Sequence, residues 1–142
     1  MKKEILTTKR LILREILPED AVVMFELNSN KEVLKYTGDK PFDSVEEVKE
    51  FLTNYSDYTK NGFGRWLVQL RKNGEIIGWC GLKKHPDNKV DLGYRFFQHH
   101  WNKGYATESA KACLNYGFIE LNLKEIIGNS DTRNNASIRV LE

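Results

Sequence analysis

Residues 96–116 read F-F-Q-H-H-W-N-K-G-Y-A-T-E-S-A-K-A-C-L-N-Y, and the interpretation of the whole chain starts from this stretch. Its first residues are typical of the end of a strand, a polar turn with Lys103 and Gly104 follows, and an alanine-rich helix begins at Tyr105. Glycine at position 104 lets the backbone approach a bulky ligand, and the methyl group of Ala106 obstructs that approach little. Because a helix N-terminus presents unpaired N–H groups and a partial positive charge, the pattern predicts an anion-binding loop. An ordinary turn with a helix N-cap is the alternative.

The two common phosphate-binding patterns, G-x-x-x-x-G-K-S/T and G-x-G-x-x-G, do not occur in the chain. The segment W-N-K-G-Y-A-T-E instead resembles the pyrophosphate loop Q/R-x-x-G-x-G/A of the GNAT superfamily of N-acetyltransferases. Trp101 in the first position is typical of the RimJ/RimL-like branch, which acetylates the N-termini of ribosomal proteins. T-K-R-L-I-L-R from Thr8, D-L-G-Y-R-F before the loop and N-N-A-S-I-R-V-L-E from Asn134 occur in the family's order. The resemblance covers nearly the whole chain and implies an acetyl-CoA-dependent N-acetyltransferase.

Length and composition fit a single soluble domain spanning residues 1–142. The hydrophobic content is 40%, the charged content is 30%, and the net charge of +2 comes from interspersed signs, which argues against a nucleic-acid-binding protein. We find neither a signal peptide nor an apolar run long enough to span a membrane. Cys80 and Cys113 are far apart and lack metal-binding spacing, so we expect two reduced, buried thiols in a cytoplasmic protein and no metal site.

Hydrophobic periodicity and turn signals predict one α+β domain with a mixed, mostly antiparallel central sheet flanked by helices. The expected strands are 10–15, 65–71, 75–83, 90–97 and a short strand 123–128 parallel to the one before it. The expected helices are 18–28, one that runs from Asp43-Ser44 through Tyr55, 105–119, and one that begins at Asn134. The glycines at positions 78 and 81 predict a bulge or a close backbone approach. The resemblance implies that this is the acyl-CoA N-acyltransferase fold.

Members of the family usually complete the last helix and add two strands, whereas this sequence ends at Glu142. We therefore expect a C-terminally incomplete fold, either because the chain is truncated or because the natural protein is short. A strand left open at a sheet edge can pair with another chain, which allows a homodimer.

The resemblance assigns most cofactor contacts to the backbone. Groups around Phe96 are expected to bond the pantetheine arm of acetyl-CoA, and the loop amides are expected to hold the pyrophosphate. The loop residues are Trp101, Asn102, Lys103, Gly104, Tyr105, Ala106 and Thr107. Lys103 either contacts a phosphate or is a solvated surface lysine. Asn134 and Ser137 match the family's N-x-x-S, which contacts the cofactor near the thiol, although simple N-capping is the alternative.

Acetyl transfer requires a neutral amine, and Asp91 matches the position at which relatives place a catalytic glutamate. Because aspartate is one methylene shorter than glutamate, a relay water is expected. The alternative is an exposed strand carboxylate paired with Lys89 or Lys83. The general acid of many relatives is a tyrosine beyond the last helix and is not assigned here. Tyr94 and Tyr105 are expected to pack instead.

No residue is marked as an acyl-enzyme nucleophile, so we expect direct attack of the amine in a ternary complex. The acceptor is a primary amine, either a ribosomal-protein N-terminus or a small molecule. Glu46, Glu47 and Glu50 could attract a cationic acceptor or could form a solvated helix face. A catalytically silent CoA-binding or protein-interaction module is the rival function.

His99 and His100 are expected to be surface loop residues, because neither has another ligand at metal-binding spacing. The remaining aromatic side chains before and after them are expected to belong to the core rather than to a platform for nucleic-acid bases. They are Trp66, Trp79, Phe96, Phe97 and Trp101.

Overall fold

The computed structural model describes residues 4–27 and 43–128. Within these ranges the chain forms a six-stranded sheet in the order β1-β2-β3-β4-β5-β6. The strands are β1 (Glu4–Thr7), β2 (Leu11–Glu15), β3 (Arg65–Leu70), β4 (Ile76–Lys84), β5 (Val90–Phe96) and β6 (Ile127–Gly128). Neighbours from β1 to β5 are antiparallel, and β6 is parallel to β5. The predicted mixed, mostly antiparallel sheet is confirmed.

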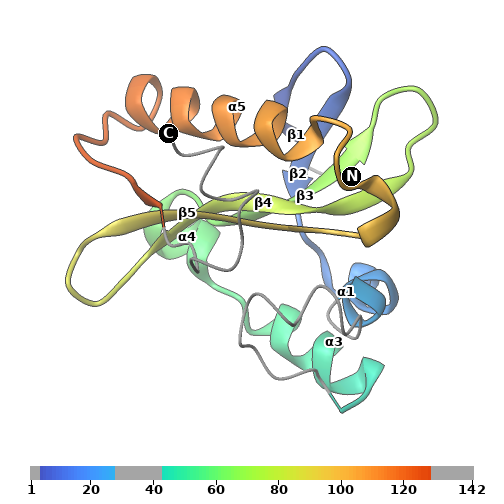
Figure 1. The fold of residues 1–142 in the computed structure, drawn as a ribbon. Coiled ribbons are helices and arrows are strands. Elements are labelled where there is room, and N and C mark those ends of the chain that lie inside the picture. The colour runs from blue at the N-terminus through green and yellow to red at the C-terminus, as the bar shows by residue number, and fades with distance from the viewer. Residues whose placement is uncertain (1–3, 28–42, 129–142) are drawn as a thin grey trace.

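Helices cover both faces of the sheet (Figure 1). Helix α5 (Tyr105–Ile119) lies on one face, and α1 (Ala21–Leu27), α3 (Val45–Thr53) and α4 (Asp57–Asn61) lie on the other. Two short 3-10 helices precede α1 and α5, at Pro18–Asp20 and Gln98–His100. The helix predicted from residue 105 to 119 has the observed bounds of α5.

Each helical layer buries its own set of apolar side chains against the sheet. Under α5 the core contains Leu82, Leu92 and Cys113, and under α1 and α3 it contains Leu67 and Val48. The predicted aromatic core is confirmed: the rings at positions 66 and 96 are buried, and those at 79, 97 and 101 pack against the two clusters. Burial of these rings supplies much of the apolar area that stabilises the fold.

The β4 glycines lie where backbone approaches backbone. The register between β3 and β4 shifts at Ile77, beside Gly78, which is the predicted bulge. A Cβ on Gly78 would lie 2.2 Å from the Arg95 carbonyl oxygen, and one on Gly81 would lie 2.3 Å from the Gly64 carbonyl oxygen. Both positions therefore exclude any larger residue without a backbone shift.

A buried ion pair fastens the layer of α1 to the sheet. Arg14 of β2 donates to both carboxylate oxygens of Asp20 at 2.9 Å, and both side chains are almost completely buried. Asp20 also accepts from the Leu17 N–H at 2.7 Å. Removing one partner would leave an uncompensated buried charge, so this pair fixes how the chain enters α1.

Some short elements differ from the expectations. β1 and α4 were not predicted, and the expected strand 123–128 is reduced to Ile127–Gly128. Leu123 and Ile126 instead pack against the core beneath α5. The helix expected from Asn134 and the predicted C-terminal incompleteness lie outside the described residues.

The two thiols are buried and free, as predicted, and their sulfur atoms lie 3.7 Å apart. Burial raises the pKa of Cys113, which keeps this thiol protonated and unreactive. In the ranges that the structure describes, no helix is both long enough and apolar enough to cross a bilayer.

Candidate active site

The predicted anion-binding loop is built around two left-handed residues. Asn102 has φ 64°, and Gly104, the N-cap of α5, has φ 83° and ψ 3°. No side chain among the described residues caps this helix, and its first backbone bond runs from the Glu108 N–H to the Gly104 carbonyl at 3.0 Å. The N–H groups of residues 105–107 precede that bond and therefore have no acceptor inside the helix.

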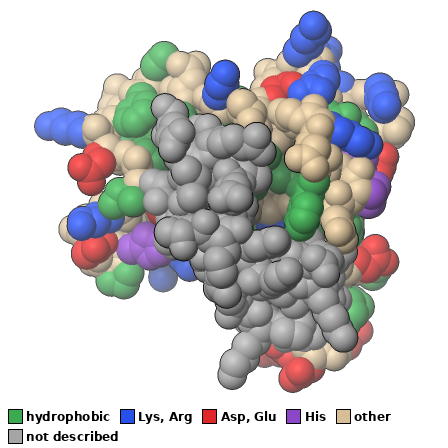
Figure 2. All heavy atoms as spheres, in the orientation of Figure 1, with side chains coloured by type: hydrophobic (Ala, Val, Ile, Leu, Met, Phe, Trp, Pro, Cys, Tyr) green, Lys and Arg blue, Asp and Glu red, His purple; other side chains and the backbone are tan. Residues whose placement is uncertain are grey.

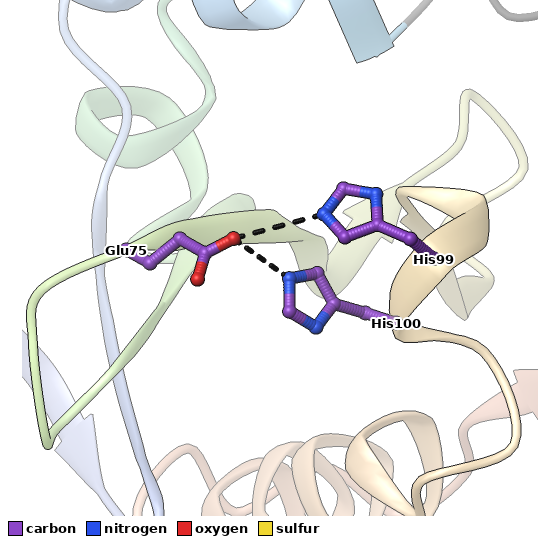
Figure 3. A group of neighbouring side chains, drawn as sticks. All are labelled: Glu75, His99 and His100. Carbon is purple, nitrogen blue, oxygen red and sulfur yellow. Dashed lines mark hydrogen bonds and ion pairs between the residues drawn. The ribbon is translucent and has the colours of Figure 1, made fainter.

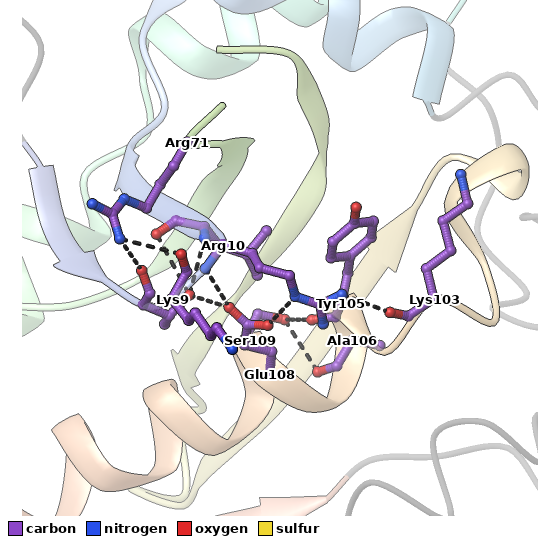
Figure 4. Close-up of polar contacts among 10 residues, drawn as sticks. Lys9, Arg10, Arg71, Lys103, Tyr105, Ala106, Glu108 and Ser109 are labelled. Carbon is purple, nitrogen blue, oxygen red and sulfur yellow. Dashed lines mark hydrogen bonds and ion pairs between the residues drawn. The ribbon is translucent and has the colours of Figure 1, made fainter. Parts of the chain in front are cut away.

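Arg10 brings a positive charge to this loop from the turn between β1 and β2 (Figure 4). Its Nη1 donates to the Lys103 carbonyl at 3.0 Å, and its guanidinium lies over the Tyr105 ring, 4.5 Å from the ring centre. A Cβ on Gly104 would lie 3.2 Å from Arg10 Nη2. No role was predicted for Arg10, although it lies in the T-K-R-L-I-L-R signature.

Glu108 in the first turn of α5 holds Arg10 in place. Its carboxylate accepts from Arg10 Nε at 2.5 Å, from the Arg10 N–H at 2.9 Å and from Thr8 Oγ1 at 2.5 Å. Burial by itself raises the pKa of Glu108, but the hydrogen bonds from Thr8 and Arg10 outweigh burial and lower the pKa overall. The carboxylate therefore stays charged at neutral pH and ties the β1–β2 turn to α5.

The free side of β5 presents backbone groups near the loop. The Phe97 N–H donates to the Ile77 carbonyl of β4 at 3.0 Å, so alternate residues, including Tyr94 and Phe96, turn their backbone groups away from β4. In the described chain, β6 pairs only with Asp91 and Leu92. The Phe96 carbonyl accepts from the Trp101 indole N–H at 2.9 Å, which links this strand to the loop.

Asp91 is buried, with 4% of its surface exposed, and its partners differ from those expected. Its Oδ1 lies 2.9 Å from Arg65 Nη2, and its Oδ2 lies 2.6 Å from His85 Nε2. The alternative of an exposed carboxylate paired with Lys83 or Lys89 is wrong, because the β4–β5 hairpin folds His85 back onto the strand and Arg65 reaches across from β3.

Arg65 is itself held from several sides. Its Nη1 donates to the Gly81 carbonyl at 2.8 Å, and its guanidinium lies 5.1 Å from the centre of the Trp79 ring. Its backbone N–H donates to Tyr55 Oη at 3.0 Å, and its carbonyl accepts from Tyr58 Oη. The Asp91 carboxylate therefore sits against a rigid cation, while the ring of His85 is the more accessible partner, with 36% of its side chain exposed.

A cavity of about 620 Å³ opens on the face of α3 and α4 and reaches β4 at Lys83. Its lining combines carboxylates, aromatic rings and one lysine: Glu47, Glu50, Phe51, Asn54, Tyr55, Ser56, Asp57 and Lys83. Lys83 is the cross-strand partner of Asp91, so these two side chains leave the sheet on the same face. His85 lies just beyond the end of β4, and its ring reaches the Asp91 carboxylate on that face.

The structure also shows where other predicted residues of the site lie. Tyr105 packs against the core, as expected, and so does Tyr94. Lys103 is exposed, and its backbone carbonyl accepts a hydrogen bond from the Arg10 guanidinium. Asn134 and Ser137 lie outside the described residues.

The expectation that His100 is a surface residue is wrong. Only 7% of its side chain is exposed, and its Nε2 lies 2.8 Å from Glu75 Oε2 (Figure 3). The hydrogen bond to His100 is the main cause of a lowered pKa of Glu75. His99 is exposed, as expected.

Comparison with known proteins assigns the family. The model of the acetyltransferase (GNAT) domain matches residues 10–142. The uncharacterized N-acetyltransferase p20 of Bacillus licheniformis is 33% identical over 141 residues, which is 97% of this chain and 79% of that protein. The chain therefore belongs to the GNAT family and is an N-acetyltransferase, a class of acyltransferase.

Two solved structures share the fold. Spermidine N-acetyltransferase from Vibrio cholerae, in complex with CoA and spermine, has a TM-score of 0.79 and 22% identity, and covers 94% of this chain and 79% of its own. RimL, a ribosomal L7/L12 α-N-protein acetyltransferase in its apo form, also has a TM-score of 0.79, with 18% sequence identity. The match covers 99% of this chain and 78% of the RimL chain. The fold is the acyl-CoA N-acyltransferase fold. Because the two TM-scores are equal, they do not distinguish a spermidine acetyltransferase from a RimL-like acetyltransferase.

The family uses acetyl-CoA, and the residues present fit this molecule. Glycine at position 104 leaves room for the Arg10 guanidinium, which would lie 3.2 Å from a Cβ there, and the adjacent N–H groups of α5 have no acceptor inside the helix. Arg10, held by Glu108, places its positive charge beside these groups. These are the requirements of a pyrophosphate site.

Proposed function

We propose that the protein transfers the acetyl group of acetyl-CoA to a primary amine that carries further positive charge, by direct attack in a ternary complex. Membership of the family supports the reaction. The observation that carries the choice of acceptor is the cavity that reaches Lys83, the cross-strand partner of Asp91. Three carboxylates (Glu47, Glu50 and Asp57) and one ammonium group, that of Lys83, line this cavity.

In this proposal the loop from Trp101 to Thr107 holds the pyrophosphate through its backbone amides, with Gly104 at the point of closest approach. Arg10 adds a charge-assisted contact from one side, and Lys103 from the other. The backbone of β5 at Phe96 guides the pantetheine arm. Asn134 and Ser137 stay predicted contacts near the thiol. Acetyl-CoA supplies an acetyl group activated as a thioester.

His85 is proposed to accept the proton of the substrate ammonium. Its Nε2–H points to Asp91, which leaves the lone pair on Nδ1. The amine nitrogen, once deprotonated, bonds to the acetyl carbon, the carbon–sulfur bond breaks, and CoA leaves as a thiolate. This thiolate takes up the proton that the nitrogen loses as it becomes an amide, so CoA is released as a thiol. Asp91 acts as a positioning residue that holds the tautomer and stabilises the imidazolium, as the aspartate of a catalytic triad does. Histidine suits this task because it exchanges protons near neutral pH.

The charge of the cavity favours a polyamine over a ribosomal-protein N-terminus. Carboxylates spaced along α3 and at Asp57 can pair with several ammonium groups of one flexible chain. Phe51 and Tyr55 offer apolar surface to the methylene segments between them. The spermine complex of the Vibrio cholerae enzyme is consistent with this class of acceptor. A protein N-terminus, the acceptor expected of the RimJ/RimL-like branch, is the second candidate.

The test is a panel of acceptors in an assay of CoA thiol release. Spermidine, spermine, butylamine and a peptide with a free N-terminal serine would be compared at equal concentration. Two matched variants of α3 extend the panel: Glu50→Gln changes a cavity residue, whereas Glu46→Gln changes an exposed residue outside the cavity.

We expect the polyamines to be acetylated fastest. Glu50→Gln should raise the KM for spermidine by about threefold to tenfold, because one charge pair of a partly exposed site is lost, while Glu46→Gln should leave it unchanged. Faster turnover of the peptide or of butylamine would refute the choice of acceptor. Binding of acetyl-CoA without turnover of any amine would favour the silent module.

A further inference from the structure

Outside the proposed active site, Glu75, His99 and His100 bring a carboxylate and two imidazoles to one point (Figure 3). Glu75 Oε2 lies 2.8 Å from His100 Nε2 and 3.7 Å from His99 Nε2. One ligand atom from each side chain lies within 4.8 Å of those of the other two. Both rings therefore direct a nitrogen at the same oxygen.

The backbone builds this cluster from two distant segments. Glu75 ends the β3–β4 turn, whereas His99 and His100 lie in the 3-10 helix Gln98–His100. The two imidazoles lie side by side, with ring centres 4.2 Å apart, rather than on opposite sides of the chain. His100 is fixed by burial, while the side chains of His99 and Glu75 are 67% and 43% exposed and can adjust.

We propose that this cluster binds a divalent transition-metal ion, for which Zn²⁺ is the best match. Two imidazole nitrogens and one carboxylate oxygen form a common donor set for this ion, with water completing a tetrahedron. Zn–N and Zn–O distances of about 2.0–2.2 Å place neighbouring ligand atoms roughly 3.3 Å apart. The observed separations of 2.8 and 3.7 Å lie on either side of that value, so small rotations of the exposed side chains complete the site.

The second nitrogen of His100 is compatible with this role. Its Nδ1 is buried and has no hydrogen-bond partner among the described residues. In the metal-free site Nε2 donates its proton to the Glu75 carboxylate, and a metal ion would replace that proton, so that the remaining ring proton would sit on Nδ1. The site departs from the sequence analysis, which predicted no metal, because the spacing of ligands along the chain does not reveal a carboxylate that folding brings from another turn.

The metal would fasten the β3–β4 turn to the segment that leads into the loop. Trp101 follows His100 directly and bonds to the Phe96 carbonyl, and the ring of His100 packs edge-on to Tyr105, the first residue of α5. Metal binding would thus stabilise the folded chain around the start of α5. It does not depend on acetyl transfer, so it can be tested without acetyl-CoA or an amine.

The experiment is a titration of untagged, chelator-treated protein with Co²⁺, followed by absorption spectroscopy, and with Zn²⁺ by calorimetry. Glu75→Gln and His99→Ala remove one donor each at exposed positions, where folding is easily preserved and is checked by circular dichroism. His85→Gln, the change of the remaining histidine of the chain, is the matched control.

We expect one Zn²⁺ per chain, a visible Co²⁺ spectrum that Zn²⁺ removes, and a rise in Tm with Zn²⁺. Glu75→Gln and His99→Ala should weaken binding at least about tenfold and abolish the rise in Tm, while His85→Gln should change neither. Absence of binding to the folded wild type would overturn the proposal. So would equal affinity in the wild type and both donor variants, or equal weakening by His85→Gln.

Discussion

Among single residues, Asp91 and its two partners define the chemical centre of the proposed site. Arg65 fixes the carboxylate from the sheet, and His85 connects it to the more accessible side. A buried carboxylate between two such groups has no free path to an ammonium in solution, whereas the imidazole has one. This geometry is why the proton acceptor is assigned to His85 and not to Asp91 itself.

The roles of these two residues predict different kinetic changes. His85→Gln should lower kcat by about 10² to 10⁴ without altering acetyl-CoA affinity, because a general base contributes that much. Asp91→Asn should lower kcat less, since the imidazole stays in place but loses the carboxylate that orients it. Lys89→Gln, an exposed change in the same hairpin, is the control.

Steady-state kinetics between pH 5 and 9 would distinguish these outcomes. Wild-type kcat in His85→Gln, with an unchanged pH profile, would remove His85 from the mechanism. A matching loss in Lys89→Gln would point to the fold of the hairpin instead of the imidazole.

For single residues, the sequence predicted which positions belong to the site better than it predicted which residues contact them. Asp91 and Gly104 were selected because family motifs surround them, and Gly104 has the left-handed conformation that only glycine adopts readily. His85 was missed since no local pattern marks it, and Arg10 was given no role although it lies in the T-K-R-L-I-L-R signature. Their significance depends on a hairpin that folds back and on a contact between residues 10 and 108, which only the tertiary fold provides.

Among the elements, α5 depends on its attachment to the β1–β2 turn through Glu108. This carboxylate accepts three hydrogen bonds, one of them from the guanidinium that also faces the loop. Loss of the carboxylate charge would therefore weaken the fold and, at the same time, free the Arg10 guanidinium from its position beside the loop.

Glu108→Gln should lower the free energy of unfolding by about 1–2 kcal/mol at pH 7, because charge-assisted bonds at a partly buried site are lost. The folded state lowers the pKa of Glu108, so its contribution is fully present above the pKa of the unfolded chain and disappears as pH falls through the lower folded value. The difference between wild type and variant should thus shrink below about pH 4.

Urea unfolding of both proteins at pH 7 and at acidic pH measures this difference. Glu120→Gln, at the exposed C-terminal end of the same helix, is the matched control and should have little effect. A constant difference at all pH values would show that the charge of Glu108 is not responsible.

The sequence also predicted long elements better than short ones. The bounds of α5 matched because a left-handed glycine starts it and the apolar pattern runs for 15 residues. β1 and α4 have only 4 and 5 residues, too few for a period to be recognised. The stretch 123–128 was assigned to a strand from its apolar residues, but Leu123 and Ile126 are apolar because they pack beneath α5.

At the scale of the whole molecule, the face in Figure 2 carries side chains of both signs. Lysine and arginine side chains gather at the upper right, with acidic side chains among them, where Figure 1 places the β1–β2 and β3–β4 turns, and further acidic side chains lie at the lower edge near α3. Lys9, Arg10, Arg71 and Lys72 are exposed in those turns. The anionic acetyl-CoA and a cationic amine would thus approach different ends of the sheet, which favours a ternary complex.

The most direct test of this account is a calorimetric titration of acetyl-CoA into the wild type and two glutamate variants. Gly104→Glu places bulk and negative charge in the loop. Gly62→Glu is the matched control, because Gly62 has nearly the same left-handed backbone, with φ 80°, and a Cβ there would meet no atom of the described residues within 4 Å. Both changes carry the same backbone strain of about 1–2 kcal/mol.

We predict that the wild type and Gly62→Glu bind acetyl-CoA alike, with Kd between about 1 µM and 1 mM, and that Gly104→Glu, while folded, gives no binding heat. Equal affinity in Gly104→Glu and the wild type, or no binding by the folded wild type, would contradict the assignment of the loop.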